Sequence, residues 1–248
     1  FGDETTWTDV LKMNQVIEAA VDPTTALSVG LKVDASALPA AVVAGIQNGS
    51  ISLTDPQTTL ALLQLNAVVG VKGQVSTTTD GKLKLDRVGI TCALCHSTVD
   101  NSFASGIGNR LDGYPNRDLD PGLIISLSPS LTAAQKAVYA SWGKGKFDPR
   151  FNHDGLNNPV VIPPAFGLYG LPKVIFTGDG DVEHESVGPV AYWNRYVAVT
   201  EMGGHGKFND KRTGVNIDNT GGGADLVTDK LPALQAYQLS LAAPKALE

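Results

Sequence analysis

Two cysteines and a histidine stand together in the middle of the chain, in the run Cys92-Ala93-Leu94-Cys95-His96. These are the chain's only two cysteines, and the histidine is one of four. In a C-x-x-C-H run, the two thiols can form thioether bonds to the vinyl groups of a haem, and the histidine can bind the iron through an imidazole nitrogen. The motif therefore predicts one covalently attached haem c, bound by Cys92, Cys95 and His96.

Two other chemistries use closely spaced cysteines. A C-x-x-C pair also occurs as a redox-active dithiol or a disulfide, so a thioredoxin-like role is the first alternative. A structural zinc site needs four ligands, and the sequence contains no second C-x-x-C and no H-x-x-x-H to complete one. Haem attachment is the interpretation that also uses His96.

A second axial ligand for the iron has few candidates. Met13 and Met202 are the only methionines, and His153, His184 and His205 are the remaining histidines. Met202 directly precedes a glycine-rich run, which lets backbone approach a ligand closely, so we expect Met202 to bind the iron, with His205 as the alternative. We expect Met13 in a helical core, His184 in a surface ion pair and His153 in a loop.

Two further polar clusters have weaker functional interpretations. Asn116, Asp118 and Asp120 have the spacing that begins a calcium loop, but the glycine is displaced to Gly122 and Leu127 stands where the loop requires Glu. We therefore favour a turn-rich loop over a calcium site. An acidic run occurs later in the chain and is expected to be a solvated face that attracts a basic redox partner: Asp179, Asp181, Glu183 and Glu185.

Composition limits the class of protein. The net charge of −6 argues against nucleic-acid binding. The sequence contains no run of 18 apolar residues, so it has no candidate membrane span. Because haem c is assembled on exported chains, the motif predicts a periplasmic or otherwise extracytoplasmic protein, and a start at Phe1 fits removal of a signal segment. Leu247-Glu248 matches the remnant of a C-terminal tag.

The elements that position the motif are predicted from periodicity and capping signals. Asp55-Pro56 and the capping box at Thr132 each predict the start of a helix. A β-hairpin about Asp80-Gly81 leads into the motif. Further helices are predicted from Thr8 or Asp9 to Val21, where Asp22-Pro23 stops the helix, and from Ser186 and Leu231 onward. The stretches Asn101–Pro129 and Gly143–Pro164 are predicted to be irregular loops, and Asp218–Gly223 to be a glycine-rich turn.

Four segments resemble the bacterial cytochromes related to di-haem cytochrome c peroxidases. They are Ile90–His96, Pro163–Leu168, Phe176–Gly180 and the helix through Tyr192-Trp193-Asn194 that leads to Met202. The resemblance covers about Thr91 to Leu241. It implies that Pro164 belongs to a segment lining the haem, and it agrees with iron ligation by Met202. We expect a backbone carbonyl near Pro164 to accept a hydrogen bond from the His96 ring.

The chain also departs from that family. It has one C-x-x-C-H motif where the peroxidases carry two haems, and Gly178 replaces the histidine of a His-Asp-Gly turn. His153-Asp154-Gly155 has the letters of that turn but precedes Pro163-Pro164. A second haem domain outside this chain is therefore one expectation.

Together these observations predict a mainly α fold. We expect a single haem-binding domain over residues 1–248, with a helical extension and hairpin over residues 1–90 packed on a cytochrome c-like core over residues 91–243. The core would have long irregular loops. Electron transfer with His96 and Met202 on the iron is the favoured function. A haem domain of a peroxidase-related enzyme and a gas-binding haem module are the alternatives.

Overall fold

The computed structural model describes residues 4–148, 155–175 and 178–244. They divide into two compact units. The N-terminal unit comprises residues 2–148 and 157–163, and the C-terminal unit comprises residues 149–156 and 164–248. The C-x-x-C-H motif belongs to the first unit and Met202 to the second.

The first predicted helix is split in two. A π-helical turn, η1 (Thr5–Val10), is followed by α1 (Met13–Ala20). Lys12 between them has φ 58°, in the left-handed region that side chains other than glycine rarely adopt. The break changes which residues face the core, because Met13 is only 2 % exposed whereas Val10 is 57 % exposed. Met13 is thus a core residue, as its place on the apolar face predicted.

Asp-Pro pairs begin the next helices. Asp55 accepts a hydrogen bond from a backbone N–H of α4 (Pro56–Gln64), as predicted. Asp22 caps α2 (Pro23–Ser28) in the same way. Asp22-Pro23 therefore begins a new helix as well as ending the preceding one. Between α2 and α4 lies the apolar helix α3 (Ala40–Gln47).

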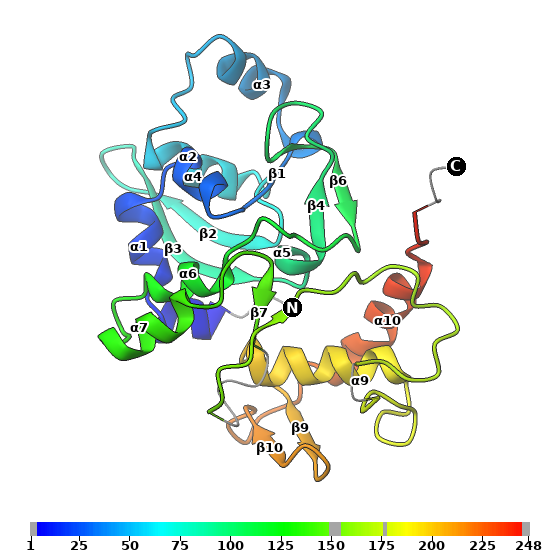
Figure 1. Ribbon diagram of the computed structural model, residues 1–248. Coiled ribbons are helices and arrows are strands. Elements are labelled where there is room, and N and C mark those ends of the chain that lie inside the picture. Colours follow the sequence, from blue (N-terminus) through cyan, green and yellow to red (C-terminus); the bar gives the residue numbers. More distant parts are fainter. Residues whose placement is uncertain (1–3, 149–154, 176–177, 245–248) are drawn as a thin grey trace. The chain divides into compact units, whose positions relative to one another are not determined.

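The predicted hairpin forms strands β2 (Val71–Thr77) and β3 (Leu83–Ile90). Its turn contains Gly81, whose φ of +81° requires glycine's freedom. The strands pack beside α1 and α4, as Figure 1 shows. One hydrophobic core includes side chains from both sides of position 90, among them Leu60, Leu85, Leu94, Ile107 and Leu119. Residues 1–90 and the segment after the motif therefore share a single core.

After the hairpin, short elements alternate. The motif forms a single helical turn, α5 (Ala93–His96), and leads into β4 (Ser97–Val99). The stretch predicted to be a loop over Asn101–Pro129 contains regular structure: β5 (Ile107–Gly108), β6 (Arg110–Asp112) and α6 (Pro121–Ser126). The predicted capping box begins α7 (Ala133–Ala140). The remaining elements of this unit are β1 (Val33–Asp34), the 3-10 turn η2 (Ala35–Ala37), β7 (Lys146–Phe147) and β8 (Val160–Val161).

The C-terminal unit is built on α9 (Pro189–Tyr196) and α10 (Leu231–Ser240), shown in yellow and red in Figure 1. The π-helical turn η3 (Val197–Glu201) extends α9, and a 3-10 turn, η4 (Thr228–Lys230), precedes α10. An unpredicted antiparallel pair, β9 (Lys207–Asp210) and β10 (Val215–Asp218), packs on η3 and α9. The core of this unit centres on aromatic and branched side chains: Tyr192, Tyr196, Val199, Phe208, Val227 and Leu231.

The prediction of a mainly α fold is wrong. The described residues contain five separate two-stranded sheets, each pairing only two short strands, spread through both units. Four of these pairs lie outside the one hairpin that the sequence indicated. They arise because strands of two to four residues pair with segments brought close by tertiary packing, and so short a strand has too few residues to show a period-two pattern. The architecture is a mixture of short helices and small sheets.

Two further expectations concern the C-terminal residues and membrane spans. Leu247-Glu248, predicted to be a tag remnant, lies outside the described residues. None of the helices in the described part of the chain has the length and apolar character that a bilayer span requires.

Acid should destabilise the C-terminal unit through Asp210, a buried carboxylate. Hydrogen bonds from Arg212 and then Tyr192 hold its pKa well below the ordinary value. Since an unfolded Asp titrates near about 3.9, the unfolded chain takes up the proton first as the pH falls. The stability that Asp210 contributes is therefore present above about pH 4 and is lost below it.

Thermal unfolding followed by circular dichroism between about pH 6 and pH 2 measures this effect. Asp210→Asn should cost about 1–3 kcal/mol at neutral pH, because Arg212 and Tyr192 lose a charged partner. It should also flatten the acid dependence. Asp229→Asn, at an exposed position of η4, is the matched control. Parallel pH curves for the native protein and Asp210→Asn would contradict the assignment.

Candidate haem-attachment site

The one-turn helix α5 brings the three motif residues together. Cys92 is its N-cap, and its carbonyl oxygen accepts a hydrogen bond of 3.0 Å from the backbone N–H of His96. Both cysteines are free thiols, and both are partly buried. The turn therefore presents two thiols and an imidazole within five consecutive residues.

The turn is held against the segment before the hairpin at Gly70. The N–H of Thr91 donates to the Gly70 carbonyl at 2.8 Å. A Cβ on Gly70 would lie 2.0 Å from the backbone nitrogen of Leu94, and Gly70 has φ +76°. Only glycine fits this contact, so residue 70 fixes how close the two backbones come.

The His96 ring is oriented by a residue far along the chain. Its Nδ1 lies 3.0 Å from the carbonyl oxygen of Pro163, and both residues belong to the N-terminal unit. Because a carbonyl oxygen only accepts, Nδ1 must carry the proton, which leaves Nε2 as the nitrogen available to a metal. Sequence reasoning predicted an acceptor near Pro164; the acceptor is one residue earlier, while Pro164 is exposed and begins the long segment of the C-terminal unit.

Burial sets the protonation of all three groups. Loss of hydration raises the pKa of Cys92, and raises the pKa of Cys95 to about 12. The same cause lowers the pKa of His96, although the hydrogen bond to Pro163 opposes it. At neutral pH the site therefore holds two protonated thiols and a neutral imidazole. A neutral imidazole is the form in which histidine binds a metal.

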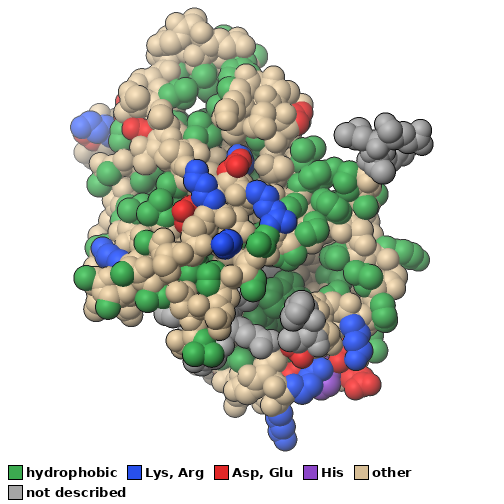
Figure 2. Space-filling view, in the orientation of Figure 1, with side chains coloured by type: hydrophobic (Ala, Val, Ile, Leu, Met, Phe, Trp, Pro, Cys, Tyr) green, Lys and Arg blue, Asp and Glu red, His purple; other side chains and the backbone are tan. Residues whose placement is uncertain are grey.

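Apolar side chains without cover lead up to Pro163. Val160 and Val161 of β8 are 56 % and 51 % exposed, and exposed hydrophobic side chains are visible on the face drawn in Figure 2. β8 is anchored to β7, and the N–H of Ile162 donates to the Gly145 carbonyl at 2.9 Å. The strand end is therefore held in place by backbone hydrogen bonds while both valines remain exposed.

Met202, the predicted second ligand, lies in the C-terminal unit at the end of η3. Its N–H donates to the Val197 carbonyl at 3.0 Å, a π-helical bond. Its side chain is 5 % exposed, so Met202 is one of the buried hydrophobic residues of the described chain. The alternative ligand, His205, is exposed.

The glycines after Met202 are needed by the unit's own packing. A Cβ on Gly204 would lie 2.6 Å from the Ala198 carbonyl, and one on Gly206 would lie 2.8 Å from the Val227 side chain. The sequence suggested that these glycines let backbone approach a haem. In the structure they let the chain turn back onto η3, which fixes where Met202 ends the helix.

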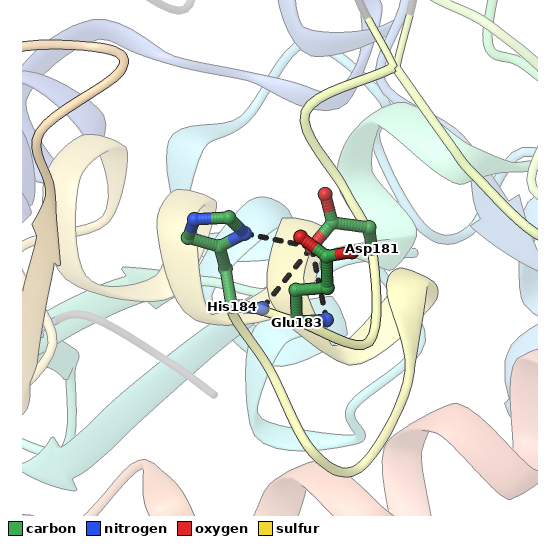
Figure 3. Close-up of side chains that lie close together, drawn as sticks. All are labelled: Asp181, Glu183 and His184. Atoms are coloured by element: carbon green, nitrogen blue, oxygen red, sulfur yellow. Dashed lines mark hydrogen bonds and ion pairs between the residues drawn. The ribbon is translucent and has the colours of Figure 1, made fainter.

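Asp181, Glu183 and His184 are the described residues whose His, Cys, Asp or Glu ligand atoms gather closely enough to suggest a metal, within 4.8 Å of one another (Figure 3). Asp181 already accepts hydrogen bonds from the backbone N–H groups of Glu183 and His184 and from His184 Nδ1. It also pairs with Arg212 at 2.9 Å. These bonds account for the cluster as a capped turn. His184 is exposed and has an acidic partner, since its Nδ1 lies 2.8 Å from Asp181 Oδ1.

The acidic run is not a solvated face. Asp181 and Glu185 are 6 % and 7 % exposed, and Glu185 pairs with Arg195 at 2.6 Å. Ion pairs with Arg212 and Arg195 hold Asp181 and Glu185 inside the unit, while Glu183 stays exposed. The prediction of a solvated face is therefore wrong for Asp181 and Glu185.

The three residues of the suggested calcium loop have separate partners. Asp118 pairs with Lys32 at 2.5 Å. Asp120 caps α6 by accepting from the N–H of Leu123. Asn116 turns its amide N–H group toward backbone carbonyls. Such an arrangement is a tightly bonded loop, in line with the favoured interpretation.

Some predicted residues lie outside the described chain, namely His153, Asp154 and the Phe176-Thr177 part of the third resembling segment. Sequence reasoning missed Gly70, and it considered Asn116 only as a possible calcium ligand and Pro163 only as part of the Pro163–Leu168 segment. Pro163 contributes its carbonyl oxygen, and Gly70 allows a close approach of two backbones. Of these two roles, only that of the glycine is indicated by the residue type.

Comparisons with protein families, with curated proteins and with solved structures found no match to this chain. The site's geometry therefore carries the functional argument by itself.

Gly70→Ala should loosen α5, the turn that carries the C-x-x-C-H motif and is called the attachment turn below. The added methyl group meets the backbone of Leu94, and a left-handed φ alone costs an L-residue about 1–2 kcal/mol. Gly81→Ala is the matched control, because Gly81 has a similar φ and no atom within 4 Å of the added Cβ. Urea unfolding should show a larger loss of stability for Gly70→Ala than for Gly81→Ala. Equal losses would mean that the close approach at Gly70 is unimportant.

Proposed function

We propose that this protein is an electron-transfer protein that carries one covalently attached haem c. The observation that carries the proposal is the hydrogen bond between His96 Nδ1 and the Pro163 carbonyl within a C-x-x-C-H turn. A metal-binding histidine usually donates its second ring nitrogen to such an acceptor, which fixes its tautomer and raises its basicity. A dithiol redox pair has no need of an oriented histidine.

Cys92 and Cys95 attach the group. Each thiol would add across one vinyl C=C bond: a new S–C bond would form at one carbon, and a proton would end on the other. No oxidant is consumed, but both cysteines must be reduced, which agrees with their free state.

The iron ligands would be His96 and Met202. When bound, a haem c supplies a one-electron redox centre, and a thioether ligand raises its potential relative to a second histidine. The position of Met202 at the end of η3, directly before a glycine-rich run, supports this role. Val160 and Val161, which are exposed and precede Pro163 in the chain, would supply apolar cover that restricts water and favours the reduced state.

Location and partner are part of the same proposal. Covalent haem attachment takes place on exported chains, so the protein belongs in the periplasm or another extracytoplasmic space. Its net charge of −6 favours a basic redox partner, whose association should slow as salt increases. A second haem domain outside this chain would be an alternative partner.

Expression with export and a haem c maturation system tests the proposal. A pyridine haemochrome assay should give one haem per chain, and mass spectrometry should show covalent attachment. The double change Cys92→Ala and Cys95→Ala should abolish attachment, because no thiol remains. His96→Ala should lose the low-spin spectrum, whereas His184→Ala, at an exposed histidine paired with Asp181, should retain it.

A native chain that takes up no covalent haem under these conditions would sink the proposal. A high-spin iron that turns over peroxide would favour the peroxidase-related enzyme. Ready binding of carbon monoxide to the reduced protein would favour the gas-binding module.

Met202→Ala should remove the weak red absorption that sulfur ligation gives ferric haem and should lower the reduction potential. Met13→Ala, in the core of the N-terminal unit, is the matched control. It should destabilise the fold by about 2–5 kcal/mol without changing the red band. If Met202→Ala left the spectrum unchanged, His205→Ala would be the next variant to measure.

A further inference from the structure

The attachment turn is too short to satisfy its own carbonyl groups. α5 has four residues, and the last four carbonyls of a helix have no partner within it. In the N-terminal unit, the segment 113–116 provides partners for three consecutive carbonyls. The N–H of Gly113 donates to His96 at 2.8 Å, and the N–H of Asn116 donates to Cys95 at 2.8 Å. The side-chain Nδ2 of Asn116 lies 3.4 Å from the Leu94 carbonyl.

Asn116 is the centre of this arrangement. Its Nδ2 also donates to the carbonyl of Gly30 at 2.9 Å, so one amide group joins the attachment turn to the segment after α2. Gly30 has φ +88°, and a Cβ there would lie 2.1 Å from the Asp118 carbonyl, so the two backbones touch beside Asn116. The residue is 2 % exposed, and its amide bonds therefore form away from water.

The acceptor half of the same amide is unused. Asn116 Oδ1 is buried and accepts no hydrogen bond from any described residue. Exchanging the two amide atoms would place oxygen against two carbonyl oxygens, so the observed orientation is the favourable one. A buried side chain with an unpaired acceptor is unfavourable by itself. The Asn116 side chain stabilises the turn through its amide N–H group, which bonds the carbonyls of Leu94 and Gly30.

We propose that Asn116 is the positioning residue for His96. Its side chain bonds the carbonyls of Leu94 and Gly30, and its backbone N–H bonds the Cys95 carbonyl. The side chain thereby fixes the turn from which the imidazole projects, while Pro163 fixes the ring's Nδ1. This inference rests on the proposed haem function, because the orientation of His96 matters through the ligand field that it imposes on iron.

The test compares Asn116→Leu with the native holoprotein. Leucine keeps a similar volume and removes the amide donor. Asn116→Ser, which is smaller and polar, provides a second variant should leucine prevent folding. Asn194→Ala is the matched control. Asn194 lies in the C-terminal unit, is 5 % exposed and donates a side-chain hydrogen bond to Gln238 of the same unit. The measurements are the ferric spin state, the reduction potential and the rate of cyanide binding.

Both Asn116 variants should keep covalent haem, since the thiols are intact, but should shift the potential and gain a high-spin fraction. Cyanide should bind about tenfold faster, the factor that corresponds to one lost hydrogen bond. Asn194→Ala should lower the unfolding midpoint without these spectroscopic changes. Native spin state and potential in both Asn116 variants would overturn the inference while leaving the haem proposal intact.

If the native chain takes up no haem, the proposed function fails and the positioning of the turn is still measurable. Asn116→Leu should then raise the alkylation rate of Cys95 in the folded, haem-free protein about tenfold, again the effect of one lost hydrogen bond. Asn194→Ala should leave that rate unchanged. Equal rates in the native protein and Asn116→Leu would overturn the positioning role.

Discussion

The hydrogen bond from the His96 ring to the Pro163 carbonyl joins segments 67 positions apart. Both of its ends are held. On one side, Gly113 and Asn116 bond the carbonyls of α5; on the other, Ile162 is bonded to Gly145 beside the β7–β8 pair. The imidazole therefore has a fixed tautomer before any ligand arrives, and the folding of the N-terminal unit supplies that preorganisation.

Local signals predicted local structure well. Asp55-Pro56 and the Thr132 capping box each began a helix where expected, because one side chain and one backbone N–H decide a helix start. The Asp80-Gly81 hairpin succeeded for the same reason. The break at Lys12 could not be predicted, since the apolar period continues through it and the burial of Met13 and Thr8 against the hairpin decides the backbone path.

Within the candidate site, the sequence identified the residues that carry reactive side chains and missed those that act through backbone. Cys92, Cys95 and His96 are defined by type and spacing. The Pro163 carbonyl and the contact at Gly70 depend on tertiary approach, which no residue type encodes by itself. Asn116 attracted attention for its oxygen as a possible calcium ligand, whereas its nitrogen makes the contacts. The acidic run was predicted to be a solvated face, but Asp181 and Glu185 are buried and paired inside the unit.

The direction of the Met202 side chain depends on the number of residues in the π-helical turn η3 that precedes it. A π-helical bond spans one more residue than an α-helical bond, so η3 contains a residue that a continuous α-helix would not need. Removing one residue from Val197–Thr200 would restore α-helical bonding and rotate the residues beyond η3 by about 100° about the helix axis. Such a deletion alters no charge, yet it would turn the Met202 thioether away from its present direction.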